Sequence, residues 1–142
     1  MASSETRSNG DGFLGVSEFF KNLRVLSPLR VIQISGPSIF ETICSVDSFS
    51  IKDGWLNAIT PHYHWHLELN RFRHLTTRDT IHERSGRRVL LFELRESGDD
   101  EPFLLIYLHR DKGEEFDRAR RDAFAALQER CSEGVHIEQT RQ

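Results

Sequence analysis

The segment Pro61–Leu69 places three of the seven histidines of this 142-residue chain within five residues. If the segment is a β-strand, side-chain alternation puts four polar residues on one face: His62, His64, His66 and Glu68. Imidazole nitrogen is the commonest side-chain metal ligand, and it titrates near neutral pH. This face therefore indicates a metal ion, a haem iron or a proton-transfer site.

Two other interpretations of the same run remain open. The opposite face of the strand would carry Tyr63, Trp65 and two leucines, so a solvated histidine face beside a core-facing aromatic stripe explains the pattern without any ligand. If the run were a helical turn instead, His62 and His66 would lie four residues apart on one face. Periodicity does not separate a strand from a helical turn over so few residues.

Metal-ligand spacing supplies one functional alternative. His62, His64 and Glu68 resemble the first metal motif of cupins, in which two strand histidines and a carboxylate share a face. This alternative is a small enzyme that holds a divalent ion through these residues, with His66 as an additional candidate ligand, and keeps one coordination position open. Walker A, G-x-G-x-x-G and G-x-S-x-G motifs are absent from the sequence, so the common nucleotide-binding and hydrolase classes are not indicated.

β-rich runs separated by turn signals must position these residues. Ser17 is the expected cap of a short helix with Phe19 and Leu23 on its apolar stripe, and Pro28 ends that helix. Asp53-Gly54 is a hairpin signal. The expected strands are Arg30–Ser35, Ile39–Val46, Phe49–Lys52, Trp55–Ile59, Phe72–Glu83, Val89–Leu94 and Phe103–Leu108.

A long C-terminal helix is the last expected element. Asp111 and Glu114 form a capping box, and Gly134 stands where a helix would stop. Its apolar face would carry Phe116, Ala119, Ala123, Phe124, Leu127 and Cys131. The pattern predicts one α+β domain of antiparallel sheets over residues 13–142, with Trp55 and Phe92 in its core and residues 1–12 as a disordered tail.

Composition narrows the class of protein further. A net charge of −3 argues against the general attraction to phosphate on which nucleic-acid binders rely. No apolar run approaches the roughly 20 residues that span a bilayer, and the N-terminus carries no signal-type apolar stretch. Cys44 and Cys131 lack any CxxC spacing and are expected to be reduced. These features predict a cytoplasmic protein without membrane insertion.

Between about residues 34 and 127 the chain carries an ordered series of short motifs. They are Gly36–Ile39, Asp53–Asn57, His66-Leu67, His74-Leu75, Val89–Phe92, Leu104–Leu108, Arg110-Asp111 and a helix with Phe124 and Leu127. The series resembles the haem-iron-utilisation proteins of the ChuX/HutX type, which are single-domain relatives of HemS and ChuS. The interval between the two His-Leu pairs is the part of the resemblance that identifies candidate ligands of the haem iron.

The resemblance implies a haem-binding or haem-trafficking protein with His66 as the axial ligand of the iron and His74 as the reserve candidate. It also implies split antiparallel sheets with flanking helices, and a homodimer closed through the sheets. Gln33 stands where single-domain members carry a second important histidine, so ligation from one side is expected. A carrier is favoured over an enzyme because the chain has no flavin or nicotinamide signature.

Haem binding also requires an apolar wall for the porphyrin and cations for its two propionates. Trp65 and Phe72 are expected to contribute to the wall, and Arg73 and Arg84 to contact the propionates. The structure can show which of these side chains lie on the same surface as His66.

Overall fold

The computed structural model describes residues 14–46, 49–71, 73–130 and 137–138. Its two helices are α2 (Val16–Leu26) and α3 (Arg118–Arg130). The strands are β1 (Leu14–Gly15), β2 (Leu29–Ser35), β3 (Ser38–Cys44), β4 (Ser50–Lys52), β5 (Trp55–Ile59), β6 (His64–Glu68), β7 (His74–Ile81), β8 (Arg88–Arg95), β9 (Leu104–Leu108) and β10 (Ile137–Glu138). The proposed tail, residues 1–12, lies outside the described residues, as do Phe72, Cys131 and Gly134.

Two antiparallel sheets form the body of the protein. The large sheet has five strands in the order β3-β2-β9-β8-β7, and the small sheet has three in the order β4-β5-β6. β1 and β10 pair in parallel as a short separate ribbon. The α+β class and the split antiparallel sheets that the sequence predicted are therefore confirmed.

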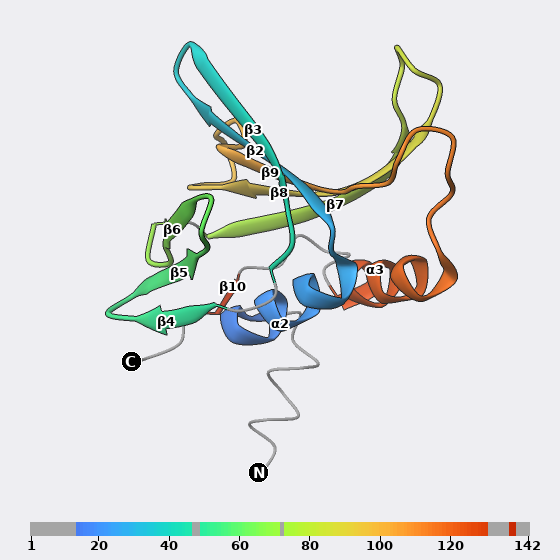
Figure 1. Ribbon diagram of the computed structural model, residues 1–142. Helices are drawn as coiled ribbons and strands as arrows, with labels where there is room; N and C mark the ends of the chain where they lie inside the picture. Colours follow the sequence, from blue (N-terminus) through green and yellow to red (C-terminus); the bar gives the residue numbers. More distant parts are fainter. Residues whose placement is uncertain (1–13, 47–48, 72, 131–136, 139–142) are drawn as a thin grey trace, which may run out of the picture.

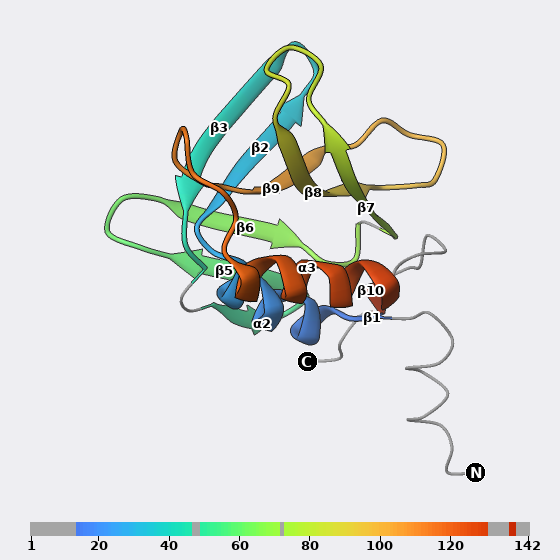
Figure 2. The same ribbon diagram turned by 90° about the vertical axis from the view of Figure 1, so that its right-hand side faces the viewer.

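The hydrophobic core lies between the helices and one face of the large sheet. Figures 1 and 2 show α2 and α3 side by side on that face, with the small sheet next to them. Phe92 of β8 is fully buried, and its ring lies 5.2 Å from that of Phe19 on α2 and 5.1 Å from that of Phe124 on α3. Edge and tilted ring contacts of this kind add to the stabilisation from burial alone.

No described helix covers the opposite face of the large sheet, which we call the open face (Figure 1). Strand pairing places 16 side chains of the five strands on it: Arg30, Ile32, Ile34, Ile39, Glu41, Ile43, His74, Thr76, Arg78, Thr80, Val89, Leu91, Glu93, Arg95, Leu105 and Tyr107. Two isoleucines of the edge strand β3 are well exposed there, Ile39 at 64% and Ile43 at 51%.

A tight hairpin sets the register of the small sheet. Asp53 and Gly54 have φ values of 55° and 82°, the left-handed conformation that a two-residue hairpin turn requires at both positions. The predicted Asp-Gly hairpin is thus confirmed. It pairs Lys52 with Trp55, and the next hairpin then places Asn57 directly opposite His66.

Both predicted helix starts are wrong. α2 begins at Val16 with Gly15 as its N-cap residue, so Ser17 lies in the first turn instead of before it. Asp111 and Glu114 form a turn in which the Glu114 N–H donates to the Asp111 carbonyl at 3.0 Å. α3 begins seven residues after Asp111, and Asp117 caps it by accepting a hydrogen bond from the Arg120 N–H at 2.8 Å. The chain therefore uses the later of two possible acidic caps.

Replacement of Asp117 by alanine is expected to cost about 1 kcal/mol of unfolding free energy, because the N–H that it caps loses its acceptor. Asp111→Ala is the matched control and should change stability by less than about 0.5 kcal/mol, as surface substitutions do. Urea unfolding of both variants measures the difference. Equal losses in the two variants would contradict the assignment of the cap.

One core assignment from the sequence also changes, and one buried residue was not foreseen. Trp55 is 40% exposed, so the expectation that it contributes to the core is wrong, whereas Phe92 is confirmed. Arg120 is buried although it is charged, because its guanidinium donates to the carbonyls of Leu26 at 2.9 Å and Pro28 at 2.8 Å. The first bond satisfies a carbonyl at the end of α2 that has no helical partner, and the second reaches the carbonyl of Pro28 beyond the helix, which also accepts from the His109 N–H.

Candidate functional site

The histidine run is a strand, not a helical turn. β6 turns His64, His66 and Glu68 to the outer face of the small sheet, while Trp65 and Leu67 face inward. His62 precedes the strand in a turn, where its N–H and that of Tyr63 donate to the Thr60 hydroxyl at 3.1 and 3.0 Å. The predicted alternation is confirmed for β6, and His62 lies outside it.

The outer face of the small sheet centres on His66. Its Nδ1 lies 2.7 Å from Oδ1 of Asn57, the residue directly opposite on β5. The ring of His64 lies edge-on to that of His66, with 5.9 Å between the ring centroids. Both histidines are exposed, so their imidazoles are accessible to a ligand.

Apolar side chains of β5 flank this imidazole. Trp55 and Ile59 lie on the same face as His66, because their cross-strand partners are Glu68 and His64. Ile59 is 60% exposed. Sequence reasoning did not select Asn57, Trp55 or Ile59 for the site. The signal that finds them is the turn at Thr60–Tyr63 that joins β5 to β6, since the register of these two strands determines which β5 side chains share a face with His66.

Other residues predicted for the site lie elsewhere. Trp65 faces the core, where its ring packs edge-on against Phe20 with centroids 6.2 Å apart. His74 begins β7, and its imidazole is so close to Gly98 that a Cβ there would lie 3.2 Å from the ring. Arg73 follows β6, and its Nη1 donates to the Asn70 carbonyl at 2.7 Å. Trp65 therefore faces away from His66, and His74 belongs to the large sheet.

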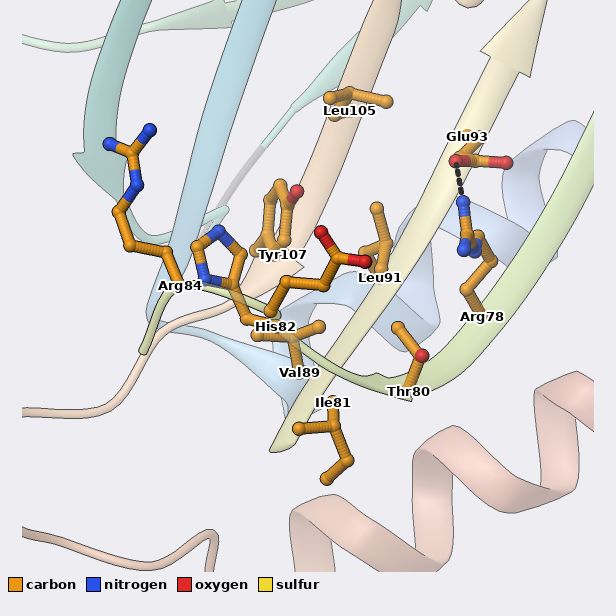
Figure 3. A pocket seen from close by; sticks show the side chains of 11 residues that line it. Arg78, Thr80, Ile81, His82, Arg84, Val89, Leu91, Glu93, Leu105 and Tyr107 are labelled. Carbon is orange, nitrogen blue, oxygen red and sulfur yellow. Dashed lines mark hydrogen bonds and ion pairs between the residues drawn. The ribbon is translucent and has the colours of Figure 1, made fainter. Parts of the chain in front are cut away.

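Arg84 lines a different region, a hollow of about 820 Å³ over the open face of the large sheet (Figure 3). The floor of the hollow includes Leu91 and Leu105, and no residue of the small sheet lines it. The Glu93 carboxylate also lines the hollow. It forms an ion pair with Arg78 at 3.4 Å, and other neighbouring side chains bind it as well. The hollow therefore combines an apolar floor with an arginine and a carboxylate whose charges already form an ion pair with each other.

Tyr107 stands beside this floor in Figure 3. Burial, and secondly the nearby Glu93 carboxylate, raise the pKa of the Tyr107 phenol above its usual value. The phenol is consequently neutral at physiological pH, and it acts as a hydrogen-bonding group and not as an anion.

The described residues contain no group of three or more His, Cys, Asp or Glu side chains arranged to hold a metal ion. His64, His66 and Glu68 share a face, but His62 lies in the preceding turn and is not placed with them. The divalent-ion alternative through His62, His64 and Glu68 therefore finds no support.

Comparison with solved structures identifies the fold, while no family model and no curated protein matches the sequence. The haem-binding protein ChuX superposes with a TM-score of 0.68 at 14% identity, over 83% of this chain and 73% of that one. A protein of Agrobacterium tumefaciens gives 0.66 at 17% identity, over 80% and 64%. Holo-PhuS, a haem-binding protein of Pseudomonas aeruginosa, gives 0.64 at 19% identity, over 78% and 32%.

These similarities define the class of architecture, an α+β fold of split antiparallel sheets with two helices on one face. Within this class, the chain has the fold that ChuX and PhuS have. The resemblance to the ChuX type is therefore confirmed at the level of the fold. The chain spans less than two thirds of the Agrobacterium protein and about one third of PhuS. Neither helix in the described part of the chain is long and apolar enough to cross a membrane.

Proposed function

We propose that this protein binds haem on the outer face of the small sheet, with His66 as the axial ligand of the iron. One observation carries the proposal: an exposed imidazole, held by a hydrogen bond at one nitrogen and flanked by exposed apolar side chains, in a fold that ChuX and PhuS share. Bound haem would supply an iron with an axial position for that imidazole.

The residues around His66 match the parts of a haem. Trp55 and Ile59 offer apolar contact area for the porphyrin, a role that the sequence had assigned to Trp65. We assign the propionates to two cations, exposed Lys52 at the end of β4 and Arg73 after β6. Arg84 has no place in this arrangement because it lies over the large sheet. His74, packed against Gly98, remains the reserve ligand.

A cytoplasmic carrier is the form of this function that we propose. The outer face is an open sheet surface, so ligation from one side suits reversible uptake and transfer. Degradation of haem would require electrons and oxygen at the iron, and the sequence carries no flavin or nicotinamide signature that would supply them.

Titration of the purified protein with ferric haem tests the proposal. A shifted and sharpened Soret band that saturates at one haem per chain is expected, because an imidazole replaces water at the iron. A spectrum that remains the sum of free haem and protein through the titration would refute haem binding.

We further propose that a second copy of the chain covers the open face of the large sheet. Exposed apolar patches on soluble proteins commonly mark interaction sites, and Ile39 and Ile43 extend such a patch to the edge strand. Arg30 and Glu41, 3.2 Å apart on the same face, provide charges of both signs, which a two-fold related copy can complement.

Sedimentation at micromolar concentration should therefore give the mass of a dimer. Ile43→Glu is expected to return the protein to a monomer, because it would bury a carboxylate in the interface. Val25→Glu, on the equally exposed side of α2, is the matched control and should remain dimeric. A monomeric wild type would contradict the proposal.

A further inference from the structure

We infer that Asn57 is a positioning residue that holds His66 in the tautomer with the proton on Nδ1 and the lone pair on Nε2. The ring would then be ready to ligate a metal through Nε2 before any ligand arrives. The use of this lone pair for haem rests on the function proposed above, whereas the tautomer itself does not.

The orientation of the Asn57 amide determines which atom faces His66. Its Nδ2 donates to the backbone carbonyl of Trp55 at 3.2 Å, and its Oδ1 faces His66 Nδ1 at 2.7 Å. If the amide were flipped, its Oδ1 would face the Trp55 carbonyl oxygen. Both atoms are acceptors, so no hydrogen bond could form between them. The amide oxygen therefore stays toward His66 and requires a proton on Nδ1.

The backbone on both sides of Asn57 is firmly anchored. Leu56 and Ala58 point into the core and are 0% and 3% exposed. On β6, the partner strand, Leu67 is buried in the same way. The two strands therefore keep Asn57 and His66 opposite each other, and the short asparagine side chain has little freedom to lose.

The inferred tautomer is not the one that an unconstrained histidine prefers in water, which carries its proton on Nε2. A hydrogen bond to the nitrogen that does not ligate is the usual means of selecting the other tautomer and orienting the ring. His64 provides an internal comparison, since it is exposed on the same face one residue pair away, opposite Ile59, a residue without a polar side chain.

Nitrogen-15 NMR of the haem-free protein, labelled at histidine and held near pH 8, tests the inference directly. We expect Nε2 of His66 to give the shift of an unprotonated ring nitrogen and Nδ1 that of a protonated one. Asn57→Ala should move His66 to the tautomer of free histidine, and Asn57→Asp should retain Nδ1–H because a carboxylate also accepts. Wild-type His66 with its proton on Nε2, or no change in Asn57→Ala, would overturn the inference.

Asn70→Ala is the matched control, because this asparagine lies beside Gly54 at the turn between β4 and β5 and should leave the His66 signals unchanged. In the haem titration, Asn57→Ala is expected to bind about tenfold more weakly than the wild type, the lower end of the effect of losing an outer-shell partner. Asn57→Asp should recover most of that loss. If the wild type binds no haem, the proposed function fails, and the NMR experiment still decides the role of Asn57.

Discussion

Replacement of His66 by alanine is expected to weaken binding of ferric haem by about 100-fold, or roughly 2.7 kcal/mol. The substitution removes the axial nitrogen and leaves the strand intact, because the side chain is exposed and its neighbours Trp65 and Leu67 keep β6 packed against the core. Soret titrations of the wild type and the variant measure the difference.

His62→Ala is the matched control, since this histidine lies in the turn before β6 and its hydrogen bond to Thr60 uses the backbone. It should bind haem as the wild type does. His136→Ala, outside the described residues, should also behave as the wild type. His74→Ala tests the reserve ligand. Equal affinities for all of these proteins would falsify the assignment of His66.

The largest effect on stability is expected at Phe92. Phe92→Ala should lower the unfolding free energy by about 3–5 kcal/mol, because a fully buried aromatic ring is replaced by a cavity. The loss of its ring contacts with Phe19 and Phe124 also loosens both helices from the large sheet. Chemical denaturation followed by circular dichroism gives the value.

Trp55→Ala is the comparison variant for this measurement. The indole of Trp55 is 40% exposed on the outer face of the small sheet, so its removal should cost less than about 1.5 kcal/mol of stability. A loss at Trp55 as large as that at Phe92 would contradict the placement of the core.

Local rules predicted most of the fold from the sequence. The alternation of side chains is a property of each strand, so the inward Leu67 and outward His66 could be predicted without knowledge of the sheets. Asp53-Gly54 likewise specified its own hairpin, because few residues other than glycine and asparagine tolerate its backbone angles.

Properties that depend on contacts between distant segments were harder to predict. Arg120 is buried because the end of α2, more than 90 residues earlier, offers it two carbonyls. The cap of the C-terminal helix was assigned to Asp111 from the sequence, whereas Asp117 makes the capping hydrogen bond. Arg84 was assigned to the haem site on charge alone, whereas the turn between β7 and β8 carries it to the hollow of the large sheet.

Which residues belong to the candidate site depends on which β5 residues pair with β6. Asn57 and Ile59 are unremarkable in the sequence and belong to the candidate site only through the register of the hairpins. Trp65 was assigned to the haem wall although the same alternation places it on the other side of the strand from His66. A stricter use of that alternation would have excluded Trp65, and the pairing of Trp55 with Glu68 is what places Trp55 on the face of His66.

Paramagnetic mapping of the haem position tests the central claim most directly. Ferric haem titrated into protein uniformly labelled with nitrogen-15 should broaden the amide signals of β5 and β6, with the strongest effects at Asn57 and His66. The signals of β7, β8 and β9 that surround the hollow at Tyr107 should remain sharp. Broadening centred on Tyr107 and His82, or no broadening at any ratio of haem to protein, would contradict a haem site on the small sheet.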